Sequence, residues 1–130
     1  MGRGLYMSNE WCFTIDPQPK PRMTRQDKWK PRAIALRYWA YKDQLNLMAK
    51  LKKFVLPHEG MAIVFVMPIP KSWTKKKQEE MNAQPHRQTP DLDNLIKGFW
   101  DALADEDKHL WKVSAIKRWG KEGMIVVQEI

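Results

Sequence analysis

The segment from Pro90 to Leu103 constrains this chain most, because a clear helical pattern there begins with a group of acids. Its apolar residues recur at helical spacing and form one stripe, which consists of Leu92, Leu95, Ile96, Phe99 and Leu103. At 3.6 residues per turn, its polar residues fall within an arc of roughly 100° on the other side, and these are Asp93, Asn94, Lys97 and Asp101. The pattern predicts a helix with one face in the core and the other toward water or a ligand.

We expect this helix to begin at Asp91 or Leu92. Pro90 favours extended backbone before it, and Asp91 is a favourable N-cap residue. Acids at this point have an ordinary explanation, since they complement the helix dipole and pair with a lysine four residues away for a few tenths of a kcal/mol. A chain of net charge +8 nevertheless places a second acidic group, Asp105-Glu106-Asp107, just after the helix. Together these acids predict a site for a cation that in turn binds phosphate.

The chain is basic, with 23 lysines and arginines against 15 acids, which favours an anionic partner. A soluble basic protein without such a partner is the common alternative. Grouping of the charges argues against that alternative. One segment contains Lys20, Arg22, Arg25, Lys28, Lys30 and Arg32, and another contains Lys71, Lys75, Lys76, Lys77, His86 and Arg87.

Other chemistries find little support in the composition. Cys12 is the single cysteine, which excludes an intramolecular disulfide and a cysteine-rich zinc site. The three histidines, His58, His86 and His109, lack the close spacing of metal ligands, and we expect them in loops or on the surface. The chain has no apolar run long enough to span a bilayer and no charged-then-apolar leader, so we expect a soluble cytoplasmic protein without a membrane partner.

Short patterned segments suggest the order of the remaining elements. Residues 11–15 alternate as a strand, residues 16–32 form a basic loop without regular structure, and residues 33–53 form a long helix. The continuously apolar residues 61–67 suit a central strand covered on both faces. A short helix is expected at residues 74–82, and strands at 111–115 and 124–130, joined by a hairpin loop at 120–123.

This order, β-α-β-(α)-α-β-β, predicts an α/β (α+β) fold in which two main helices pack on a single small mixed sheet. We expect one domain over residues 1–130, with residues 1–10 as a loose lead-in. Seven tryptophans exceed what one modest core needs. For three of them, stacking on a base or sugar and covering the core or a dimer interface remain equally open, and these are Trp29, Trp73 and Trp119.

The motifs resemble those of a known family, the RusA-type Holliday junction resolvases of the phage and prophage branch. The most specific part is Asp91-Leu92-Asp93-Asn94-Leu95-x-Lys97, with Phe99, Asp101-Ala102-Leu103 and then Glu106-Asp107. Residues 19–25 and 67–73 are also similar to segments of the family. The resemblance extends from Trp11 to Ile130. It implies a bacterial or phage-encoded, homodimeric, magnesium-dependent DNA endonuclease.

Carried over from the family, Asp91, Asp93 and Asp107 bind Mg²⁺, with Mn²⁺ as a possible substitute, and Lys97 is essential for cleavage. Asp105 and Glu106 remain rivals to Asp107, because the acidic group here is longer than the usual pair. The metal would activate water against the phosphodiester, and Lys97 would stabilise the charge that develops. Asn94 and Asp101 are expected around the ligands, Asp101 as a residue that orients Lys97, binds an outer water or forms a plain salt bridge.

We therefore expect a structure-selective endonuclease that resolves four-way junction DNA by paired symmetric nicks. Two alternatives remain, a non-catalytic nucleic-acid binder and a metal nuclease acting on other branched DNA or RNA. Phosphate contacts are expected from the basic segments. The residues expected to make them are Lys20, Arg22, Arg25, Lys28, Lys75, Lys76, Lys77 and Arg87.

Overall fold

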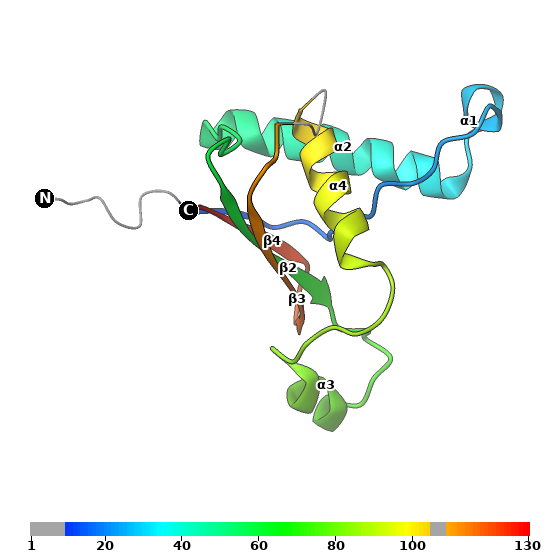
Figure 1. Ribbon diagram of the computed structural model, residues 1–130. Helices are drawn as coiled ribbons and strands as arrows, with labels where there is room; N and C mark the ends of the chain where they lie inside the picture. Colours follow the sequence, from blue (N-terminus) through cyan, green and yellow to red (C-terminus); the bar gives the residue numbers. More distant parts are fainter. Residues whose placement is uncertain (1–9, 105–108) are drawn as a thin grey trace, which may run out of the picture.

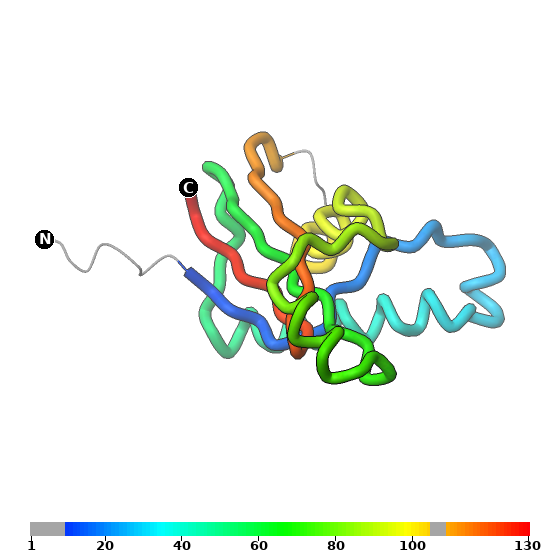
Figure 2. Tube along the Cα trace, turned by 90° about the horizontal axis from the view of Figure 1, so that it is seen from below, coloured from blue at the N-terminus to red at the C-terminus, as the bar shows by residue number. Residues whose placement is uncertain are grey.

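The computed structural model describes residues 10–104 and 109–130 and contains a four-stranded mixed sheet (Figure 1). Its strands are β1 (Glu10–Phe13), β2 (Met61–Pro68), β3 (Val113–Gly120) and β4 (Met124–Glu129). They lie in the order β1-β4-β2-β3 (Figure 2). β2 pairs parallel with β3 and antiparallel with β4, which also pairs antiparallel with β1. The predicted mixed sheet is confirmed.

Four helices accompany the sheet in the described part of the chain: α1 (Gln26–Trp29), α2 (Ala33–Lys52), α3 (Lys75–Met81) and α4 (Leu92–Leu103). Three of them were predicted. The single turn of α1 was not, because the segment around it was expected to lack regular structure. The carboxylate of Asp27 stabilises this turn, accepting hydrogen bonds from the Thr24 N–H at 2.9 Å and from Arg32 Nη2 at 2.8 Å. The Arg32 guanidinium, together with the backbone N–H groups of Thr24 and Arg32, holds the pKa of Asp27 well below its usual range.

The predicted hairpin between the last two strands is wrong, because β2 lies between β3 and β4. The connection crosses the end of β2, where a Cβ on Gly120 would overlap the side chain of Val66. Two β-rich runs around a glycine-rich loop show that two strands follow each other, but not that they pair. The uninterrupted apolar run of β2 gives it a central position instead.

The sheet has one covered and one open face in the described structure. α2 and α4 lie on the same side of it (Figure 1), over the buried side chains of Phe13, Phe65 and Ile125. β2 was expected to be covered on both faces, but on the second face Ala62 and Val64 are only half-buried, while Val66 near the end of the strand is buried. No helix of the described ranges is long and apolar enough to cross a membrane.

Backbone packing fixes the position of α4. Gly98 is buried, and a Cβ there would lie 2.5 Å from the carbonyl oxygen of Gln18. The Lys20 N–H donates to the Asn94 carbonyl oxygen at 3.1 Å, and the Tyr38 hydroxyl donates to the Gly98 carbonyl oxygen at 2.9 Å. α4 is therefore held by the segment after β1 on one side and by α2 on another.

Replacing Gly98 by alanine should destabilise the protein. In an ordinary helix this change stabilises by roughly 0.5–1 kcal/mol, but here the methyl group meets fixed backbone and should cost about 1–3 kcal/mol. Urea unfolding measures the difference. Ala40→Gly on the exposed face of α2 gives the cost of helix propensity alone. A Gly98→Ala variant more stable than the wild type would contradict the close approach.

Candidate active site

α4 begins where the sequence predicted. Asp91 occupies the N-cap position with extended backbone, after a cis peptide bond between Thr89 and Pro90. Its side chain makes no capping hydrogen bond to the helix. The carboxylate is exposed, so within the described structure it is available to bind a ligand.

Asp93 and Lys97 project from the next turns of α4, and both are exposed. Residues four apart lie on the same side of a helix, but within the described ranges neither Asp93 nor Lys97 forms an ion pair. Asp101, expected as a possible partner of Lys97, pairs instead with Lys20 at 3.1 Å. Two carboxylates and one ammonium group therefore share an exposed surface without partners among the described residues.

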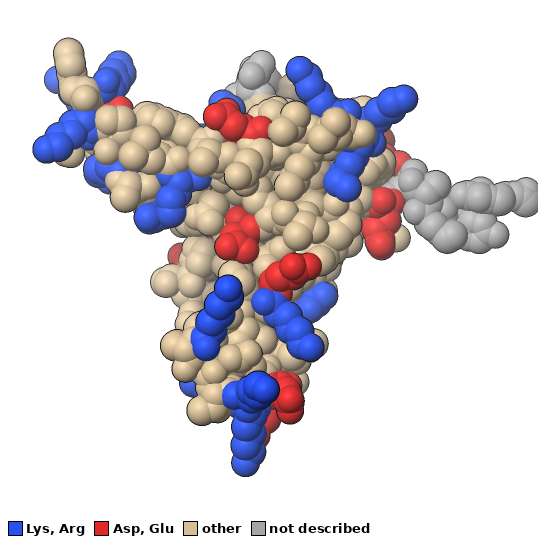
Figure 3. Space-filling view, turned by 180° about the vertical axis from the view of Figure 1, so that it is seen from behind, with Lys and Arg blue, Asp and Glu red and all other residues tan. Residues whose placement is uncertain are grey.

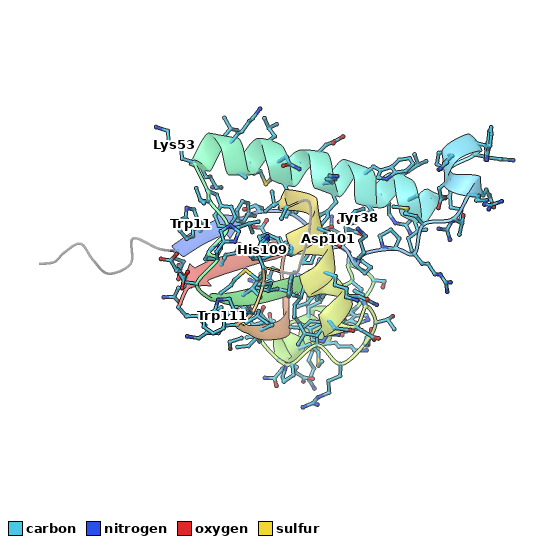
Figure 4. The ribbon with its side chains drawn as sticks, turned by 45° about the horizontal axis from the view of Figure 1, so that its top comes forward. Trp11, Tyr38, Lys53, Asp101, His109 and Trp111 are labelled. Carbon is cyan, nitrogen blue, oxygen red and sulfur yellow. The ribbon has the colours of Figure 1, made fainter. Side chains whose placement is uncertain are left out.

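The Lys20–Asp101 ion pair braces α4 against its neighbours. Lys20 Nζ also lies 5.5 Å from the ring centroid of Tyr38. Tyr38 of α2 and Asp101 of α4 face each other across the contact between the two helices (Figure 4). Burial, and to a lesser extent the charge of Asp101, raises the pKa of Tyr38 to about 12. Lys20, predicted to contact DNA, thus has an internal partner.

Lys117 of β3 makes contacts next to Asp91 that sequence reasoning missed. Its ammonium group donates to the carbonyl oxygens of Gln88 and Pro90, at 2.7 Å each. These bonds hold the loop that leads into Asp91. Lys117 occupies the side of β3 that faces the helices, opposite Phe65 in the register. The sequence prediction ended this strand at residue 115, whereas β3 runs from Val113 to Gly120, so the inward position of Lys117 was not foreseen.

Aromatic packing ties α3 to the same end of the sheet. The ring centroids of Trp73 and Trp119 are 5.0 Å apart, and those of His86 and Trp119 are 4.3 Å apart. His86 lies in the loop between α3 and α4, one of the two predicted locations, and it is buried there. Burial, followed by the charge of Lys117, lowers its pKa. Trp119 is buried as well, whereas Trp29 is 82% exposed.

The predicted metal ligands are only partly described. Asp91 and Asp93 supply the carboxylate oxygens that Mg²⁺ prefers, so their chemistry fits this ion. Asp107 and its rivals Asp105 and Glu106 lie outside the described residues. Across residues 10–104 and 109–130, no group of three or more histidines, cysteines and acids could hold a metal ion.

Leu103 and His109, described residues on either side of this acidic group, lie toward the opposite end of α4 from Asp91. Leu103 ends the helix, and the His109 ring lies 6.1 Å from that of His58, which in turn lies 5.8 Å from that of Trp100. A helix of this length spans about 18 Å. The three-carboxylate ligand set therefore stays a prediction.

Basic side chains gather at the ends of the molecule (Figure 3). On the face shown, they cover α1 and the start of α2, the C-terminal end of α2, and α3. Most of the residues predicted to contact DNA are exposed, namely Arg22, Arg25, Lys28, Lys75, Lys76, Lys77 and Arg87. An extended anion such as DNA could reach several of these groups at once.

Comparison with known proteins assigns the family. Residues 13–128 match the family model described as endodeoxyribonuclease RusA, which covers most of the chain and its acidic helix. The chain belongs to the RusA endodeoxyribonuclease family. A comparison with curated proteins finds no match. Membership confirms the resemblance seen in the sequence and makes the chain an endodeoxyribonuclease of a family that resolves Holliday junctions.

Removing the Lys117 ammonium should impair cleavage by this RusA-family enzyme. In Lys117→Met the loop before Asp91 loses two hydrogen bonds, and misplacement of a reacting group by about 1 Å costs roughly a hundredfold in rate. We expect junction cleavage to slow by roughly tenfold to a hundredfold while junction affinity changes little. Lys112→Met, just before the same strand, is the control. Equal cleavage rates for the two variants would refute the positioning role.

Proposed function

We propose that this chain is a magnesium-dependent endonuclease that resolves four-way DNA junctions by paired symmetric nicks. The observation that carries the proposal is the exposed group of Asp91, Asp93 and Lys97 at the start of α4, which has no partners among the described residues. Lys20 and Asp101, in contrast, pair with each other within the fold. Unpaired acids on a basic protein favour binding of a cation and, through it, of phosphate.

Different residues of α4 would have different roles in the reaction. When bound, Mg²⁺ or Mn²⁺ supplies a water of lowered pKa and polarises the phosphate. Asp91 and Asp93 would hold the ion, and Asn94 would hydrogen-bond water around it. Lys97, one turn beyond Asp93, would stabilise the negative charge that develops on the phosphate. Lys117 would keep Asp91 in place through the preceding loop.

Asp107 would complete the ligand set. Comparing Asp107→Asn with Asp105→Asn and Glu106→Gln decides which of the three acids is the ligand, since only loss of the true ligand should abolish cleavage. Each change removes one charge, so general electrostatics is the same in all three variants.

Cleavage and binding should respond differently to loss of the metal ligands. In Asp91→Asn or Asp93→Asn, cleavage of a labelled four-way junction with magnesium should collapse, while affinity measured without metal should persist or increase because repulsion of the DNA decreases. Asp43→Asn on the exposed side of α2 removes the same charge elsewhere. Magnesium should also raise the Tm of the wild type more than that of Asp93→Asn.

A variant of Asp91 or Asp93 that cuts at the wild-type rate would show that the residue is not a ligand. Cleavage assays on linear duplex DNA and on branched RNA, in place of the junction, test the substrate class. A stable gel shift of the wild type on junction DNA without any cleavage would favour the non-catalytic binder instead.

We further propose that the enzyme acts as a C2 homodimer through the open face of the sheet. An apolar row crosses all four strands there, Cys12, Val126, Val64 and Ile116, each paired with its neighbour in the register. Ile116 is 55% exposed. Exposed contiguous apolar surface is typical of protein interfaces, and a two-fold dimer matches the two-fold symmetry of a junction.

The dimer can be tested by light scattering. We expect twice 15.4 kDa for the wild type and a monomer for Ile116→Glu, because burying an unpaired carboxylate in the interface is unfavourable. Leu51 of α2 is 75% exposed, and the control variant Leu51→Glu should remain a dimer. A monomeric wild type that still makes both nicks in one binding event would exclude this arrangement.

A further inference from the structure

Three lysines from separate parts of the chain line one open cavity of about 510 Å³. Lys71 follows β2, Lys75 begins α3, and Lys121 lies between β3 and β4. All three are exposed to solvent. The remaining lining residues are Ile69, Gln78, Glu79 and Asn82.

The fold itself builds this cavity. The Ile69 N–H donates to the Gly120 carbonyl oxygen at 2.9 Å, which joins the loop after β2 to the end of β3. The Ala83 N–H donates to the Trp119 carbonyl oxygen at 3.0 Å, and Trp73 packs on the Trp119 ring. α3 is therefore fixed against the sheet, and the three lysines are held in one region by well-packed backbone.

The charges around the cavity are unbalanced. Three ammonium groups face a single carboxylate, that of Glu79, and in the described ranges none of the four forms an ion pair. The Gln78 side-chain amide donates to the Trp73 carbonyl oxygen at 2.7 Å and is engaged within the fold. Like charges held together repel, so an anion that enters the cavity relieves their repulsion.

We propose that this cavity binds a backbone phosphate of the DNA arm that extends from the candidate active site, an inference that rests on the proposed function. α3 and the start of α4 lie at the same end of the sheet, where β2 and β3 end (Figure 1). The segment that connects them is short, from Asn82 to Asp91. DNA cut at α4 therefore passes within reach of α3.

The structure also separates the lysines of α3, which sequence alone treats alike. Lys75 lines the cavity, whereas Lys76 and Lys77 do not. The ammonium group of Lys77 lies 4.1 Å from the ring centroid of Trp73, a cation–π contact within the fold. The phosphate contact belongs to Lys71, Lys75 and Lys121 rather than to the run of residues 75–77.

The salt dependence of junction binding, measured without divalent metal, tests the cavity. Each lost phosphate contact flattens the slope of log affinity against log salt by about 0.9, so Lys71→Ala/Lys75→Ala/Lys121→Ala should flatten it by about 2 to 3 units. The control Lys42→Ala/Lys50→Ala/Lys52→Ala removes the same charge from α2 and should flatten it by less than about 1 unit. Thermal melts check that both variants fold. Equal slopes for the two variants would overturn the proposal.

Lysine acylation read by mass spectrometry locates the anion and distinguishes its source. Junction DNA should protect Lys71, Lys75 and Lys121 and leave Lys76 reactive. Protection by inorganic phosphate but not by the junction would overturn the DNA assignment. Cleavage by the wild type is measured separately. If the wild type cuts normally but the junction protects none of the three lysines, only the cavity proposal is wrong. If the lysines are protected but the wild type never cuts, only the endonuclease proposal is wrong.

Discussion

The missing side chain at Gly98 determines where α4 can lie. Because nothing projects from that position, the backbone of Gln18 and Pro19 approaches the helix directly. The Lys20–Asp101 ion pair and the Tyr38 hydroxyl then fix the helix along and around its axis. This orientation buries the apolar stripe and leaves Asp93 and Lys97 outside, so the position of the proposed site depends on a backbone contact made by another part of the helix.

The charged residues fall into two groups with different physical roles. Asp27 with Arg32, Asp101 with Lys20, and Lys117 with two carbonyl oxygens are satisfied within the fold. The acids and lysine of the α4 surface and the three lysines of the cavity beside α3 have no such partners among the described residues. Charges of the first kind hold loops and helices in place, and charges of the second kind are free to bind a ligand from solution.

Local sequence patterns predicted those parts of the fold that depend on local rules. The apolar stripe of α4, the N-cap position of Asp91 and the long helix α2 follow from periodicity and capping, and all are confirmed. The predicted pairing of β3 with β4 was wrong, because tertiary packing places β2 between these two strands. The roles of Lys20 and Lys117 were missed for the same reason, since their partners are remote in sequence or are backbone oxygens.

The charges around α4 have opposite effects on DNA binding. Two carboxylates at the start of the helix repel a phosphate, and the nearby cavity lysines attract one. If a metal neutralises the carboxylates, the same surface changes from repulsive to attractive only at the point of cleavage. The lysines of the cavity would hold the arm whether or not metal is present. Binding and cutting would thus be controlled by separate residues at one end of the sheet, which allows the enzyme to engage a junction before it cuts.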